Sequence, residues 1–337
     1  MSISGSALDN DDIVELPALR TPCGRGDGLA VCPILGLLVT SDSSSNTLQV
    51  FSLPSSLVDA VPMPLVRTLG GQAPMKFQFQ DYMSLVTSSG FMAFTGPATC
   101  RLLLVTDGGH KAVHVVDVAG HSPHVGFVAA PGTIPGPRGV AAKGSLVAVV
   151  MVTITRASGV RLFEGSGATW TALYEINASS NALLGGLRFT SDASQLVVCD
   201  WGRSRLSLFN VVDGSLEAHI VDGLPSGPVD VEDCGDGWLT ASYWPQSIFH
   251  SGHGVRKDLK IKPITLALVP GLGLVVRGDS WNEGNGNHHD IYFFSTCDFV
   301  AMASMSALRV GWMMGVARGT QAANFEKCTF SYFKMQR

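Results

Sequence analysis

The chain has 337 residues, of which 46% are hydrophobic and only 15% are charged. This balance is typical of a folded protein with a large core, and it excludes an intrinsically disordered chain. The formal net charge is -4, and the basic residues are scattered along the sequence. We therefore expect no nucleic-acid partner, because proteins that bind nucleic acids normally carry a basic face.

The N-terminal residues 1–12 are polar and acidic, and we expect them to be a disordered segment of a single domain that spans 1–337. They lack the basic and apolar parts of a secretory signal. No segment approaches the 18 uninterrupted apolar residues of a membrane span, so we expect no membrane partner. The seven cysteines form no CxxC pair, and Cys100 and Cys199 lie in or beside apolar runs, as buried free thiols do. These features predict the cytoplasm or another reducing, intracellular compartment.

The main feature of the sequence is a degenerate repeat. Three apolar segments, beginning at Gly28, Gly186 and Thr265, each precede an aspartate by 14 residues; the aspartates are Asp42, Asp200 and Asp279. In three copies, paired apolar residues follow eight residues after the aspartate: Val50-Phe51, Val115-Val116 and, after Asp200, Leu208-Phe209. A fixed internal spacing marks a structural unit that is used several times.

Taken in chain order, each copy divides into four short β-rich runs bounded by Gly, Pro, Ser and Asn, the pattern of a four-stranded meander. The first runs begin near residues 28, 90, 139, 186, 228 and 265, mostly 36 to 50 residues apart, which is the period of a propeller blade. We therefore predict an all-β fold, a β-propeller of six four-stranded antiparallel blades. Residues 13–16 could add the closing strand. The alternative is a seventh, split blade that uses the segment from Gly315.

The chain resembles the NHL-repeat family of β-propellers over most of its length, strongly in the first, second and fourth copies and weakly in the others. The likeness is carried by residues 28–31, 38–42 and 48–51 in the first copy, and by 186–189, 197–200 and 205–209 in the fourth. The resemblance implies a propeller with a role in binding macromolecules. Some related propellers are lactonases or amidoglycolate lyases, so the resemblance leaves the activity open.

In such a propeller, the loops between the second and third strands share one face with the loops that connect blades. This face would gather three of the six tryptophans and several basic residues: Trp201, Trp244, Trp281, Arg203, Arg138, His110 and Lys111. Tryptophan and arginine are enriched in binding hot spots, so we predict that this face binds protein partners. The alternative is that the tryptophan rings pack over the ends of the blades and are shielded there.

Two further groups of polar residues invite a chemical role. The repeated aspartate at the end of the second strand is predicted to cap the next loop by accepting backbone N–H groups. A polar loop near the C-terminal end offers weak ligands for Ca²⁺ or a transition metal: Glu283, Asn285, Asn287, His288, His289 and Asp290. Its spacing does not match the EF-hand loop, so we expect no cofactor.

The sequence contains no GxSxG, P-loop, HExxH or zinc-finger pattern. We therefore predict a non-catalytic protein-interaction scaffold, or one subunit of a larger assembly, and we favour this function over an enzyme. The alternative is a metal-dependent lactonase or lyase with its site at the mouth of the central channel. Its candidate ligands are Asp27, Asp230 and Glu283.

Overall fold

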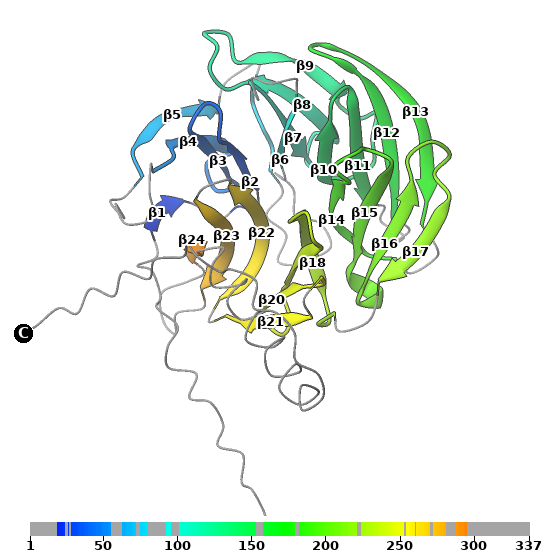
Figure 1. Ribbon diagram of the computed structural model, residues 1–337. Coiled ribbons are helices and arrows are strands. Elements are labelled where there is room, and N and C mark those ends of the chain that lie inside the picture. The colour runs from blue at the N-terminus through cyan, green and yellow to red at the C-terminus, as the bar shows by residue number, and fades with distance from the viewer. Residues whose placement is uncertain are drawn as a thin grey trace, which may run out of the picture.

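The fold is a ring of six four-stranded antiparallel sheets (Figure 1). This arrangement confirms the predicted six-bladed β-propeller. Helix in the described part of the chain is confined to a 3-10 turn, η2 (Trp201–Arg203), and no helix there is long and apolar enough to cross a membrane. The computed structural model describes residues 19–23, 26, 28–54, 63–71, 75–79, 92–95, 101–152, 158–178, 182–220, 224–252, 254–259, 261–269, 272–280 and 288–294.

Blades 1 to 5 each consist of four consecutive strands. Blade 1 contains β2 (Leu29–Cys32), β3 (Leu37–Asp42), β4 (Thr47–Ser52) and β5 (Leu65–Gly70). Blade 2 contains β6 (Met92–Thr95), β7 (Leu102–Asp107), β8 (Ala112–Asp117) and β9 (His124–Ala129). Blade 3 contains β10 (Pro137–Lys143), β11 (Leu146–Val152), β12 (Ser158–Ser166) and β13 (Thr169–Asn177). Blade 4 contains β14 (Leu184–Phe189), β15 (Gln195–Asp200), β16 (Arg205–Asn210) and β17 (Leu216–Ile220). Blade 5 contains β18 (Pro228–Asp233), β19 (Trp238–Ser242), β20 (Ser247–His250) and β21 (Val255–Asp258).

Blade 6 joins the two ends of the ring. Its order is β1-β24-β23-β22, in which β22 (Lys262–Val269), β23 (Gly273–Ser280) and β24 (His288–Phe294) receive the N-terminal strand β1 (Leu19–Cys23). The register pairs Leu19 with Ile291 and Cys23 with His289. An N-terminal closing strand is thus present, but it begins at Leu19. The predicted segment 13–16, residues 1–12 and the segment from Gly315 lie outside the described residues.

Hydrophobic cores fill the spaces between neighbouring blades. The second strands are buried along nearly their whole length, as in β11, where all residues but the first are buried, because a middle strand is covered by blades on both sides. Between blades 1 and 2, for example, Val39 and Leu48 pack in one buried cluster with Leu103 and Phe77. Burial of each such side chain stabilises the fold by roughly 1.5–3 kcal/mol.

The innermost strands approach one another through glycines. A Cβ atom added at Gly185 in β14 would lie 2.7 Å from the carbonyl oxygen of Val229 in β18, and one added at Gly186 would overlap the carboxylate of Asp230. Only glycine allows the backbones of blades 4 and 5 to come this close. The glycine that begins the repeat in the sequence therefore has a packing role at the centre of the ring.

Hydrogen bonds from buried side chains join successive blades. Thr106 in blade 2 donates to the carbonyl of Arg138 in blade 3 at 2.8 Å, and the Arg138 guanidinium reaches the Leu184 carbonyl in blade 4 at 3.4 Å. Arg277 in blade 6 donates to the Gly28 carbonyl at the start of blade 1 at 2.6 Å. Arg277 is completely buried. Its hydrogen bond to Gly28 therefore helps to join the last blade to the first.

Candidate functional site

The repeated aspartates at the ends of the second strands brace the loops that follow them. In blade 1, Oδ1 of Asp42 accepts the backbone N–H of Ser44 at 2.9 Å and that of Ser45 at 3.4 Å. Burial acts to raise the pKa of Asp42, but these hydrogen bonds and those from the two serine hydroxyls lower it overall. The predicted capping role is confirmed for this residue.

In blade 2 the same position carries a denser set of contacts. Asp107 is fully buried and accepts the backbone N–H groups of His110 at 3.1 Å and Gln78 at 3.0 Å. The ring nitrogens of His110 and His114 lie 2.9 and 3.2 Å from Oδ2 of Asp107. Burial alone would raise the pKa of Asp107, but these hydrogen bonds, that from His114 foremost, lower it to about 2. Asp107 therefore also caps its loop, and it fixes two histidines.

Asp200 in blade 4 departs from this pattern. Its Oδ2 lies 3.3 Å from Nη1 of Arg203 and 3.2 Å from Nε of Arg205. The carboxylate is almost completely buried, whereas both arginines are partly exposed. Ion pairs thus take the place of the backbone cap, and one of them holds the predicted binding residue Arg203 against the start of the loop.

Two of the three predicted tryptophans lie on one rim of the ring. Trp244 is 48% exposed, and Trp201 lies close by: a Cβ at Gly227 would be 2.6 Å from the Trp201 indole nitrogen and 3.5 Å from the Trp244 carbonyl oxygen. The ring of Tyr243 packs edge-on against Trp244 at 5.4 Å. The Lys262 ammonium lies 4.3 Å from the centre of the Trp244 ring, within the range of a cation–π interaction. Trp281 lies outside the described residues.

The other predicted binding residues differ in the solvent exposure of their side chains. His110 has a side chain 36% exposed, and Lys111 is exposed in the loop between β7 and β8. Arg138 is buried, with 5% exposure, and contacts the Leu184 carbonyl. Its guanidinium therefore links blades 3 and 4 and adds little to the surface.

Only the last three residues of the candidate metal loop, 288–290, are described, and they begin β24. Glu283, Asn285 and Asn287 lie outside the described residues. The backbone of 288–290 belongs to β24 and pairs with β23, with His288 opposite Ser280 and Asp290 opposite Gly278. These three residues are therefore part of a strand and not of a loop.

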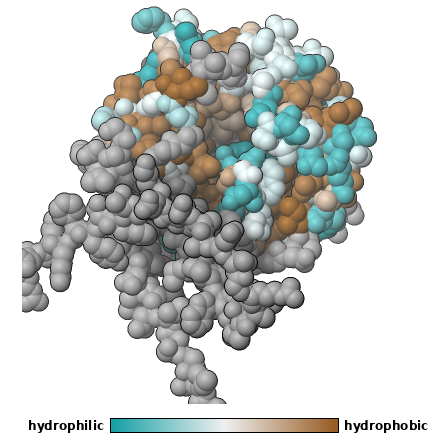
Figure 2. Space-filling model, in the orientation of Figure 1, coloured by the Kyte–Doolittle hydropathy of each residue, from teal (hydrophilic) through white to brown (hydrophobic). Residues whose placement is uncertain are grey.

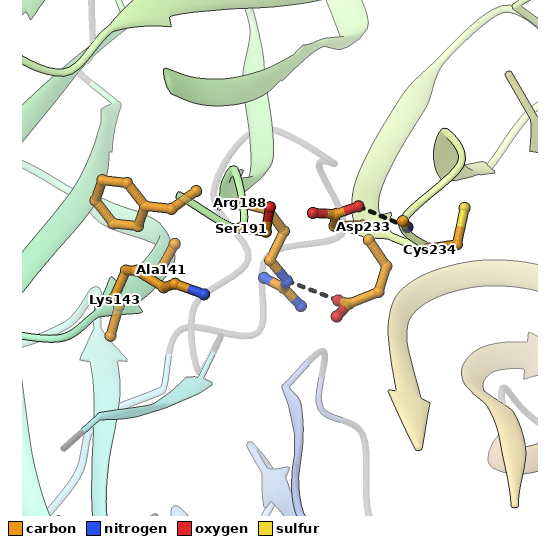
Figure 3. Close-up of a pocket in the computed structure, with 10 residues that line it drawn as sticks. Ala141, Lys143, Arg188, Ser191, Asp233 and Cys234 are labelled. Atoms are coloured by element: carbon orange, nitrogen blue, oxygen red, sulfur yellow. Dashed lines mark hydrogen bonds and ion pairs between the residues drawn. The ribbon is translucent and has the colours of Figure 1, made fainter. Parts of the chain in front are cut away.

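A cavity of about 430 Å³ opens where the inner strands β10, β14 and β18 end (Figure 3). Its polar lining comes from Lys143, Arg188, Ser191, Glu232, Asp233 and Cys234. The first-to-second strand loops lie here, so the cavity is on the face opposite the predicted tryptophan-bearing face. The lining of the cavity is charged and is not an apolar patch. The coloured surface in Figure 2 also mixes hydrophilic and hydrophobic residues.

Arg188 connects three inner strands beside this cavity. Its Nε donates to Oε2 of Glu232 at 2.7 Å, and its Nη2 lies 3.3 Å from the Leu266 carbonyl and 3.9 Å from Oδ2 of Asp230. Burial raises the pKa of both Asp230 and Glu232, and the positive charge of Arg188 opposes that rise. Asp230 also accepts the N–H of Leu266 at 2.9 Å. This network ties blades 4, 5 and 6 together at the axis.

One signal for Arg188 is present in the sequence. In the aligned repeat, Arg188 stands where the first copy has Ala30 and the sixth has Ala267. A cation at a position that is otherwise small and apolar indicates a nearby anion. Glu232 could not be named as that anion from sequence, because the fifth copy is too degenerate to align residue by residue.

Comparisons with known proteins agree with the fold. No protein-family model and no curated protein matches the chain. A gluconolactonase from Xanthomonas campestris is 14% identical with a TM-score of 0.54, and the match covers 83% of this chain and 91% of that one. A luciferin-regenerating enzyme is 11% identical with a TM-score of 0.54, over 83% and 97% of the two chains. A functionally unknown protein from Desulfotomaculum acetoxidans is 11% identical with a TM-score of 0.50, over 77% and 79%. At these identities the similarity shows a shared propeller fold and leaves the activity open.

Proposed function

We propose that this protein is a non-catalytic propeller that binds a protein partner through its tryptophan rim, defined here as Trp201, Arg203, Tyr243 and Trp244. The observation that carries the proposal is the exposure of Trp244, whose large ring remains 48% accessible beside a second tryptophan. A ring of this size gains free energy when a partner covers it. The resemblance of the chain to NHL repeats, whose propellers commonly bind macromolecules, supports the same function.

The chemistry of the rim favours a partner with an apolar anchor flanked by acidic residues. Lys262 lies over the Trp244 ring and Tyr243 packs against its edge, so the indole is held in place before binding. Rigid aromatic side chains lose little conformational entropy when they bind. Arg203 is partly exposed, and a guanidinium there can form a paired hydrogen bond with a carboxylate.

The experiment is to select binders from a library of protein loops with the purified full-length chain, and to measure their affinity by calorimetry. We expect Trp244→Ala to weaken binding at least roughly 10-fold, because buried tryptophan anchors act as hot spots. The matched control is Val212→Ala, which truncates an apolar side chain that is 86% exposed on the opposite face. Binders that tolerate Trp244→Ala and Arg203→Ala but are lost on Val212→Ala would contradict the proposal.

The alternative, a metal-dependent lactonase or lyase, fits the described residues less well. Of its three candidate ligands, Asp27 and Glu283 lie outside them. Asp230 accepts the Leu266 N–H and lies 3.9 Å from the Arg188 guanidinium. A divalent cation bound to Asp230 would be repelled by that fixed positive charge. Metal-dependent hydrolysis of gluconolactone that Asp230→Asn abolishes would favour the enzyme instead.

A further inference from the structure

Three side chains with metal-binding atoms converge in blade 5, away from the tryptophan rim. The Cys234 sulfur lies 3.3 Å from Nε2 of His250, and that nitrogen lies 3.3 Å from Oδ1 of Asp236. The sulfur, nitrogen and oxygen all lie within 4.8 Å of one another. We propose that Cys234, Asp236 and His250 form a binding site for Zn²⁺ or a similar thiolate-binding divalent cation, with water as the fourth ligand.

The backbone brings the three residues together in a specific way. Cys234 and Asp236 lie in the loop between β18 and β19, whereas His250 ends β20. A Cβ at Gly237 would lie 2.5 Å from the backbone nitrogen of Gly252, so the two loops touch backbone to backbone. The Trp238 N–H also donates to the Ser251 hydroxyl at 2.9 Å.

Two of the three separations between ligand atoms match those around a tetrahedral zinc ion. With a Zn–S bond of about 2.3 Å and Zn–N and Zn–O bonds of about 2.0–2.2 Å, neighbouring ligand atoms lie roughly 3.3–3.6 Å apart. The observed S···N and N···O distances are both 3.3 Å. To bind the ion, the Cys234 thiol must give up its hydrogen bond to the Gly237 carbonyl, which it donates at 3.0 Å.

The three proposed ligands differ in solvent exposure, as expected for a site that an ion can enter from solvent. The His250 side chain is 6% exposed, and that of Asp236 is 56% exposed. The buried His250 and the partly buried Cys234 would hold the ion, while the exposed carboxylate leaves a path from solvent and room for a bound water. Figure 3 shows the Cys234 sulfur at the edge of the cavity and directed away from Arg188.

A nucleophilic role for Cys234 fits less well than metal binding. Both Cys234 and Asp236 contact the same nitrogen of His250, whereas a catalytic triad places the acid on the other ring nitrogen. Burial, followed by the hydrogen bond and negative charge of Asp236, raises the pKa of Cys234 to about 12. In the absence of a cation the thiol is therefore protonated and a weak nucleophile.

A second cluster, Asp107 with His110 and His114, provides an internal comparison. Its ligand atoms also lie within 4.8 Å of one another, but Asp107 is already engaged by the backbone N–H groups of Gln78 and His110. It also contains no sulfur. A metal bound there would give no thiolate signal, so spectroscopy can tell the two clusters apart.

The test uses the full-length protein, stripped with a chelator and then titrated with Co²⁺ as the spectroscopic probe for zinc. We expect one equivalent to bind with tetrahedral d–d bands and a thiolate-to-cobalt charge-transfer band in the near ultraviolet. Cys234→Ser should remove the charge-transfer band and weaken binding by about 100-fold or more, since even outer-sphere changes cost about 10–100-fold. Asp236→Asn, at an exposed side chain, should weaken binding without a change in folding.

His110→Gln is the matched control, because it removes a ligand of the second cluster and leaves the first intact. It should retain the charge-transfer band and the cobalt affinity. The proposal is overturned if cobalt does not bind, if it binds without the charge-transfer band, or if the band survives Cys234→Ser. Circular dichroism of each metal-free variant verifies that it is folded. Loss of metal binding would leave the tryptophan rim untouched, so the two proposals can fail separately.

Discussion

At the scale of single residues, Asp107 shows how one buried carboxylate organises a loop. It accepts two backbone N–H groups and contacts two histidine rings. Its pKa is lowered from 3.8 to about 2. Because the folded state holds the charged form more strongly than the unfolded state does, the resulting stability is complete above pH 4 and is lost as the pH falls towards 2.

We expect Asp107→Asn to lower the free energy of unfolding at pH 7 by about 2 kcal/mol, since the pKa difference corresponds to that amount. The deficit relative to the wild type should shrink between pH 4 and pH 2. Urea unfolding of both proteins over this range would measure it. The matched control is Asp192→Asn: the pKa of Asp192 is also lowered to about 2, but by hydrogen bonds at the exposed surface. A larger effect at Asp192 than at Asp107 would contradict the assignment.

The capping role of Asp42 and Asp107 was predictable from sequence, whereas the burial of the arginines was not. An aspartate that ends a strand before a polar loop has one common structural use, and Asp42 shows it. Arg138 and Arg203 stand in similar loops of the sequence, but the first is buried against Leu184 and the second remains partly exposed. The difference depends on which carbonyl the neighbouring blade presents, and spacing along the chain does not give that.

At the scale of elements, the inner strands determine how closely the blades pack. β14 presents Gly185 and Gly186 to β18, and a Cβ at either would meet Val229 or Asp230. Arg188 leaves the same strand two residues later and reaches Glu232 and Leu266. One strand therefore supplies both the close backbone approach and the charge that holds three blades together.

We expect Gly186→Ala to destabilise the protein by about 1–3 kcal/mol, the usual cost of overpacking. Gly144→Ala is the matched control, because Gly144 has a positive φ of +60° and nothing within 4 Å of the added Cβ. It should cost about 1 kcal/mol from backbone conformation alone. Thermal unfolding of the two variants compares the effects. Equal midpoints would indicate that the inner strands can move apart without cost.

Removal of the charge in β14 should have a larger effect. We expect Arg188→Met to destabilise the protein by about 3–5 kcal/mol, because it leaves the buried carboxylate of Asp230 and that of Glu232 without their cation. Arg161→Met is the control, since Arg161 pairs with Glu175 at 3.0 Å on the surface and such pairs are worth about 1 kcal/mol or less. Urea unfolding at pH 7 would measure both. An Arg188→Met protein as stable as the Arg161→Met protein would show that the network is dispensable.

The elements themselves were largely predictable, but the cavity was not. The first strands were expected near residues 139, 186 and 228, and β10, β14 and β18 begin at Pro137, Leu184 and Pro228. Alternating apolar residues with regular turns define these strands locally. The cavity forms where three strand ends from different blades meet, and its lining depends on the rotation of one blade against the next. That angle is a property of packing between elements.

At the scale of the whole molecule, the ring is closed by a strand from the other end of the chain. β1 completes blade 6 by pairing with β24, and Arg277 joins that blade to Gly28 of blade 1. A closed ring leaves only short, protected sheet edges and makes the blades depend on one another. Loss of the closing strand should therefore weaken contacts far from the site of the change.

Two N-terminal deletions test this closure and locate the strand. Removal of residues 1–18 leaves β1 (Leu19–Cys23) in place, so we expect the thermal midpoint to stay unchanged. Removal of residues 1–23 exposes the edge of β24 and should cost about 2–4 kcal/mol, from several backbone hydrogen bonds at about 0.5–1.5 kcal/mol each. Hydrogen exchange should then rise in β24 and also in β2, because blades 6 and 1 share a buried cluster that contains Leu29 and Ile291. If removal of residues 1–18 were the damaging change, the predicted segment 13–16 would be the strand that closes the ring.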